Sequence, residues 1–203
     1  MLEVFIQAFV LYFVVIDPIG NTPIFMSITQ LQNEKEKRQT AIEAVIIATI
    51  ILILFSIIGQ FLLSYLKVSL ESFRIAGGII LFLIAIEMLF NKRQERKQQV
   101  LEQTKDKLSI FPLAIPILAG PAAITSVIVI AIEYQGNILL QSISLIGLVM
   151  VMIMTLIFFL LLTKSDKFLN KNITNIISRV IAIILAALSI QYIIDGILVI
   201  FKI

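Results

Sequence analysis

An aspartate among helix-breaking residues interrupts the first apolar stretch of the sequence, at residues 17–23 with the order Asp-Pro-Ile-Gly-Asn-Thr-Pro. The two prolines remove backbone donors and the glycine permits conformations that other residues avoid, so a helix is expected to unwind here. A carboxylate inside a bilayer costs roughly 2.5–3.5 kcal/mol on insertion scales, so Asp17 is expected to face a polar cavity instead of lipid. Asp17 and the unwound carbonyls would then bind a positively charged group.

A second interruption, at residues 119–121 with the order Ala-Gly-Pro, divides a later apolar stretch. The helix segments that follow the breaks, beginning near residues 21–22 and 122, would present free N–H groups and positive dipole ends to a carboxylate. Both charges together fit a zwitterion, an α-amino acid, and the small residues leave room for a small one. The alternative is a pair of proline kinks kept for packing, with Asp17 bonded to nearby backbone. The candidate substrate-binding residues are Asp17, Pro18, Gly20, Asn21, Thr22, Pro23, Ala119, Gly120, Pro121, Ala122 and Thr125.

Membrane helices are the elements expected to carry these breaks. Hydrophobic residues make up 60% of the chain, against about 45–50% in a soluble domain, and the mean hydropathy is +1.06. Lipid offers no hydrogen bonds to the backbone, and continuous apolar runs select helices over a barrel. The sequence therefore predicts an all-α membrane protein. At about 20 residues per span, six spans are expected, at roughly 4–31, 41–63, 73–90, 108–132, 138–162 and 179–201.

The basic residues are distributed unevenly between the two sides of such a bundle. Thirteen of the sixteen Lys and Arg residues lie in or beside the three loops on the side opposite the termini. The positive-inside rule then places the 91–107 loop in the cytoplasm and both termini outside, in the cytoplasmic (inner) membrane of a bacterium or archaeon. The loop is interpreted as a solvated linker that sets topology, with binding of a partner or of anionic lipid as the alternative.

The two halves of the chain resemble each other in the placement of their breaks. A shift of 103 residues aligns Pro18 with Pro121 and Thr22 with Thr125. Because each half has an odd number of spans, the second half would be inverted relative to the first, as in many secondary transporters. Chance resemblance of two kinked helices is the alternative. The chain is thus predicted to be one transmembrane domain, 1–203, with repeats at 1–90 and 108–203 joined by the linker at 91–107.

Proton handling would fall to carboxylates, because the chain contains no His and no Cys. Asp17, Glu43 and Glu87 are the proton-coupling candidates, although Glu43 and Glu87 are also close enough to helix ends to reach headgroup water. The missing His and Cys, and the lack of a dense acidic cluster, argue against an intramembrane enzyme. We predict no metal, no cofactor and no nucleic-acid partner, and the sequence indicates no oligomeric state.

Several motifs together make the chain resemble the MarC family of integral membrane proteins, also called SnatA or UPF0056, within the lysine-exporter superfamily. The motifs are DPIGNTPIF at 17–25, RIAGG at 74–78, AIEML at 85–89, LAGPAAIT at 118–125, and LSIQ at 188–191 with DG at 195–196. The resemblance implies a six-helix inverted-repeat fold and transport of small neutral amino acids such as glycine and alanine, with proton coupling. Ala122 departs from the family pattern, which usually has a second glycine there.

The leading hypothesis is therefore a secondary transporter or exporter, an antiporter or symporter, of small neutral amino acids, held at two unwound helix breaks near the bilayer midplane. No glycine-rich nucleotide loop is present to make ATP the direct driver. The alternatives are efflux of another small metabolite or cation, and a membrane regulatory subunit that transports nothing.

Overall fold

The structure, a computed structural model, describes residues 1–90, 92–93, 113–164 and 171–201. These residues form helices joined by short turns, with no strand among them, which confirms the all-helical class. Four helices contain segments long and apolar enough to cross a membrane, and two shorter apolar helices accompany them. The elements are α1 (Leu2–Ile16), α2 (Thr22–Ile28), α3 (Glu34–Tyr65), α4 (Leu70–Leu89), η1 (Leu113–Leu118), α6 (Pro121–Glu133), α7 (Ile138–Lys164) and α8 (Lys171–Phe201).

Polar capping residues begin α3 and α4, and the cap of α3 explains why this helix starts earlier than the expected span at 41–63. Asn33 accepts a hydrogen bond from the backbone N–H of Glu36, and the Glu36 carboxylate accepts one from the backbone N–H of Asn33. This reciprocal capping box extends α3 through a polar turn that hydropathy alone does not include. Ser69 caps α4 in the simpler way, by accepting from the backbone N–H of Ser72.

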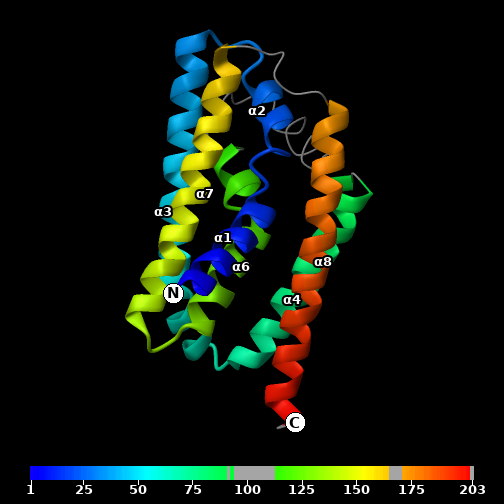
Figure 1. The fold of residues 1–203 in the computed structure, drawn as a ribbon. Coiled ribbons are helices and arrows are strands. Elements are labelled where there is room, and N and C mark those ends of the chain that lie inside the picture. The colour runs from blue at the N-terminus through cyan, green and yellow to red at the C-terminus, as the bar shows by residue number, and fades with distance from the viewer. Residues whose placement is uncertain (91, 94–112, 165–170, 202–203) are drawn as a thin grey trace.

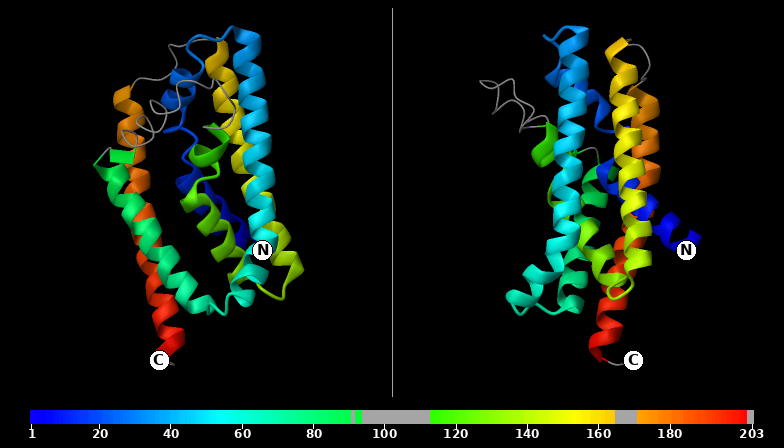
Figure 2. Two further views of the ribbon diagram at one scale, coloured as in Figure 1. Left: turned by 180° about the vertical axis from the view of Figure 1, so that it is seen from behind. Right: turned by 90° about the vertical axis from the view of Figure 1, so that its left-hand side faces the viewer.

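The helices form two outer pairs with shorter helices between them. Figures 1 and 2 show α3 beside α7 on one side of the molecule, α4 beside α8 on the other, and α1 and α6 between the pairs. Both termini lie in the half of the molecule where α3 turns into α4 and α6 turns into α7 (Figure 1). The two outer pairs therefore flank α1 and α6, the helices that carry the two breaks.

Burial separates the inner and outer helices clearly. In α6 every residue from Thr125 to Ile132 is buried, whereas α3, α7 and α8 leave many large apolar side chains exposed. A helix buried on all sides belongs to the core of a bundle, and exposed apolar faces on its neighbours suit contact with lipid. Gly78 allows α4 and α8 to pack closely, since a Cβ at this position would come within 2.8 Å of the Ser189 carbonyl oxygen.

Candidate functional site

The first helix ends at Asp17, in the middle of the molecule. Asp17 adopts a left-handed conformation, with φ 55° and ψ 65°, while its backbone N–H still donates to the Phe13 carbonyl at 2.9 Å. Its Oδ1 accepts a hydrogen bond of 2.9 Å from the Gly20 N–H, which closes a tight turn. A Cβ on Gly20 would overlap the Asp17 carboxylate. Asp17 thus ends α1 with its backbone and orders the turn with its side chain.

The carbonyl groups freed by this break have partners within the same segment. The Asn21 side-chain amide donates to the Ile16 carbonyl at 2.6 Å, and the Thr22 hydroxyl donates to the Ile19 carbonyl at 2.6 Å. The backbone N–H groups of Asn21 and Thr22 donate to the carbonyls of Asp17 and Ile19, respectively. The expectation that free N–H groups at residues 21–22 would face a carboxylate is therefore wrong. Asn21 and Thr22 build the turn.

The break is completed by a cation from the other end of the first half. Arg93 is only 6% exposed, and its Nη2 donates to the Val15 carbonyl oxygen at 2.7 Å. Its Nη1 lies 4.0 Å from Oδ2 of Asp17 and 2.9 Å from the sulfur of Met88. The last turn of α1 and the Asp17 carboxylate therefore share one buried guanidinium.

The second break lies between η1 and α6. The Ala119 N–H donates to the Ala114 carbonyl at 2.9 Å, a wide turn that spans five residues, and Ile115 leaves the helical conformation. α6 then starts at Pro121 after the extended residue Gly120, with no side-chain cap. The N–H groups of Ala122 and Ala123 fall in the first turn of α6, where a helix offers no backbone acceptor of its own. They carry the positive end of the helix dipole.

A cavity of about 220 Å³ lies against both breaks. Its polar walls are Glu87 from α4 and the Arg93 side chain, and Val15 contributes the end of α1. The remaining walls are small or apolar and come from η1, the start of α6 and the inner face of α4. They are Ile80, Leu83, Ile84, Pro116, Ile117, Leu118, Gly120, Pro121, Ala122 and Ala123. The cavity therefore combines a carboxyl group, a guanidinium group and a helix N-terminus with otherwise apolar walls.

The predicted site residues divide between this cavity and other places. Glu87, Gly120, Pro121 and Ala122 line the cavity. Asp17 is not among the lining residues; it is 4% exposed and its Oδ2 lies 4.0 Å from Nη1 of Arg93. Pro18, Gly20, Asn21, Thr22 and Pro23 form the turn and the start of α2, and Ala119 is buried beside η1.

Two predicted residues point elsewhere. Thr125 is buried one turn further along α6, where its methyl group is the nearest atom to a Cβ added at Gly77. Glu43 accepts a hydrogen bond of 2.8 Å from the Gln39 side chain in an exposed part of α3.

Arg93 is the site residue that sequence reasoning missed. It was assigned to the solvated 91–107 linker, and that assignment is wrong for Arg93, whose side chain is buried. The rest of that linker, apart from Lys92, lies outside the described residues. A signal was present: Arg93 comes four residues after the end of α4 and six after Glu87, within reach of the same cavity.

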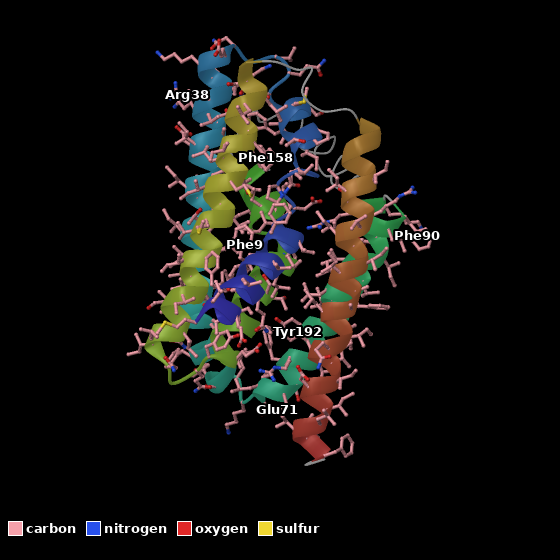
Figure 3. The ribbon with its side chains drawn as sticks, in the orientation of Figure 1. Phe9, Arg38, Glu71, Phe90, Phe158 and Tyr192 are labelled. Carbon is pink, nitrogen blue, oxygen red and sulfur yellow. The ribbon has the colours of Figure 1, made fainter. Side chains whose placement is uncertain are left out.

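A second polar cluster, partly buried, lies nearer the termini. Gln7 of α1 donates to the Glu133 carboxylate at 3.2 Å and accepts from the Tyr134 hydroxyl at 2.8 Å. Burial and the neighbouring Glu133 carboxylate raise the pKa of Tyr134, which keeps its hydroxyl a donor. The hydroxyls of Tyr12 and Tyr192 are buried without a hydrogen-bond partner among the described residues. Figure 3 shows Tyr192 on the inner side of α8.

Replacing Gln7 by Leu is expected to destabilise the protein by about 1 kcal/mol, because Glu133 and Tyr134 would both lose a hydrogen-bond partner at a partly buried place. Thermal unfolding of purified protein in detergent would measure the effect. The matched control is Gln135→Leu at the same end of the molecule, where the side chain is exposed. Equal unfolding temperatures for the two variants would show that the Gln7 hydrogen bonds carry no stability.

Comparison with known proteins identifies a family that covers nearly the whole chain. Residues 2–201 match the MarC family of integral membrane proteins. A UPF0056 membrane protein of Archaeoglobus fulgidus is 31% identical, over 96% of this chain and 92% of its own length. A UPF0056 membrane protein of Buchnera aphidicola subsp. Baizongia pistaciae is 35% identical, over 95% of each chain. The UPF0056 membrane protein YhcE of Escherichia coli is 31% identical, over 96% and 92% of the two chains.

No solved structure matches the chain. The names of these relatives describe membrane proteins and give no substrate, so they support family membership and a membrane location only. With several apolar helices and a match over nearly its full length, the protein is an integral, multi-pass membrane protein of the MarC family.

Proposed function

We propose that this protein is a secondary transporter of small neutral amino acids of the size of glycine or alanine. The observation that carries the proposal is the cavity between the two helix breaks, where Glu87, the Arg93 guanidinium and the start of α6 share one small space. A zwitterion needs an anionic partner for its ammonium group and a positive partner for its carboxylate. Glu87 and the first turn of α6 supply these two partners on the walls of this cavity. Its volume of about 220 Å³ suits a small solute, since pockets for drug-sized ligands begin at roughly 300 Å³.

The positions of the charged groups support partners for the substrate carboxylate and ammonium that differ from those expected from sequence. The substrate carboxylate would bind at the first turn of α6, near Ala122 and Ala123, where the helix dipole is positive. The ammonium would bind between the carboxylates of Glu87 and Asp17. The small side chains at 119–123 limit the pocket to substrates with a short side chain. Thr125 and Glu43 lie outside this pocket and take no part in binding.

The proposed membrane arrangement has six passes in two inverted three-helix repeats. In it, α1 with α2, and η1 with α6, each form one broken span, and α3, α4, α7 and α8 form the others. Two half-spanning helices that start from opposite sides and meet at a central site are the arrangement by which many secondary transporters expose one site alternately to each side. The positive-inside rule supports termini outside and a cytoplasmic linker in the inner membrane.

Counterflow in liposomes tests the proposal directly. Purified protein would be reconstituted with unlabelled alanine inside, and uptake of labelled glycine, alanine and leucine would be followed, with ethylamine as a competitor that lacks the carboxylate. Exchange of glycine and alanine above empty liposomes, weak exchange of leucine and little competition by ethylamine are expected. Absence of exchange would refute amino-acid transport, and strong competition by ethylamine would favour cation efflux instead.

Proton coupling is part of the proposal and has its own control. A pH gradient should accelerate uptake by the unsubstituted protein if Asp17 or Glu87 exchanges a proton during the cycle, while Glu43→Gln should behave like the unsubstituted protein because Glu43 bonds to Gln39 on α3. Unchanged acceleration in both Asp17→Asn and Glu87→Gln would exclude these carboxylates as the coupling groups.

A further inference from the structure

The contacts of Arg93 have the chemistry that a substrate ammonium group would need. A primary ammonium at a helix break binds backbone carbonyls and a carboxylate, and the Arg93 guanidinium contacts the Val15 carbonyl oxygen at 2.7 Å and lies 4.0 Å from the Asp17 carboxylate. The carbonyls of Ile16, Asp17 and Ile19 accept hydrogen bonds from inside the turn. Among the hydrogen bonds described for this break, the Val15 carbonyl is the acceptor used by a cation from elsewhere in the chain.

Burial makes an opposite charge beside Asp17 necessary. Asp17 is 4% exposed and its Oδ1 already accepts from the Gly20 N–H. An ionised carboxylate in such surroundings is costly without an opposite charge, and in the bilayer interior the cost is higher still. Arg93 compensates the charge of Asp17 at the wall of the cavity that is proposed to hold the substrate.

We propose that Arg93 stands in for the ammonium group of the substrate in the empty transporter, and that substrate displaces it from the Val15 carbonyl and Asp17. This inference rests on the proposed function and adds a role for a residue at the α4 end of the cavity. A transporter that carries its own replacement cation keeps the site neutral without substrate, so the empty form can reorient. Arg93 therefore determines whether transport is net movement of one substrate or obligatory exchange of two.

Competition between Arg93 and substrate has a predictable direction. If Arg93 fills the ammonium position in about nine of ten empty molecules, the apparent affinity for substrate is lowered about tenfold, because only the remaining fraction is competent to bind. Removing the guanidinium should raise apparent affinity by that factor. It should also leave Asp17 uncompensated in the empty form and slow the return step.

The test compares exchange with net transport in proteoliposomes containing full-length protein. Arg93→Gln should retain alanine counterflow, with a half-saturation concentration about tenfold lower, and should lose most alanine efflux into alanine-free buffer. Arg93→Lys should retain net efflux because it keeps the cation. Lys92→Gln is the matched control, since it removes the neighbouring charge from an exposed side chain and should change neither assay.

Three results would overturn the inference or its premise, and they can be told apart. Equal loss of exchange and efflux in an Arg93→Gln variant that still elutes as folded protein would make Arg93 a substrate ligand instead of a stand-in. Unchanged efflux in Arg93→Gln would show that the empty form needs no cation there. Absence of exchange by the unsubstituted protein would refute the proposed function, and this inference with it.

Discussion

Replacing Asp17 by Asn is expected to lower the unfolding free energy by about 3 kcal/mol, toward the lower end of the range for breaking a buried ion pair. The substitution leaves Arg93 buried with its positive charge uncompensated by Asp17. The turn itself should survive, because an Asn Oδ1 can accept the same hydrogen bond from the Gly20 N–H. The 4.0 Å separation of the charged atoms is the reason for expecting the lower end. The change therefore isolates the charge from the local geometry.

Thermal unfolding in detergent would measure this effect, and a double substitution would show its cause. Adding Arg93→Gln to Asp17→Asn removes both charges, so the double variant should recover most of the lost stability. Asp195→Asn is the matched control, because Asp195 accepts a hydrogen bond from Gln191 in an exposed part of α8 and should change stability by no more than about 0.5 kcal/mol. Additive effects of the two central substitutions would show that Asp17 and Arg93 do not interact energetically.

The positions of the two breaks could be predicted from the sequence because their causes are local. Pro18 and Gly20 disfavour helix within a few residues of themselves, and Pro121 fixes a helix start, whatever the rest of the chain does. Apolar composition likewise predicts helices, since a bilayer accepts little else. What these local rules do not provide is the partner of each freed backbone group.

The partners depend on contacts between distant parts of the chain. Arg93 was predicted to be a solvated, topology-setting residue because it belongs to a run of basic residues, and such runs usually are solvated. Its burial results from a contact with Val15, which lies far away in sequence. A hydropathy window or a charge count uses only residues that are close in sequence, so neither can detect this contact. Asn21 and Thr22 are a different case, because their partners are local: both side chains bond within their own turn. Helix-breaking rules predict the turn but do not say whether its polar side chains bond to backbone or to substrate.

Gly120→Ala is expected to reduce exchange about a hundredfold, the size of effect that a displacement of about 1 Å can have on a precisely arranged site. A Cβ at this position would overlap the Pro116 carbonyl oxygen. The contact is with backbone, so neither side can move away by changing a rotamer. Because Gly120 has φ −82° and ψ 174°, alanine is permitted there by backbone conformation, and the close approach of η1 is the cause of the effect.

A matched glycine on α3 distinguishes this effect from general damage to packing. A Cβ on Gly59 would meet only side-chain atoms of Ile128, which can shift, so Gly59→Ala should retain most exchange activity. Counterflow of alanine measures both variants, with unfolding temperatures to establish that each is folded. Normal exchange by a folded Gly120→Ala variant would mean that substrate does not pass between η1 and the start of α6. Since Pro116 and Gly120 both line the cavity, that result would also remove the cavity from consideration as the transport site.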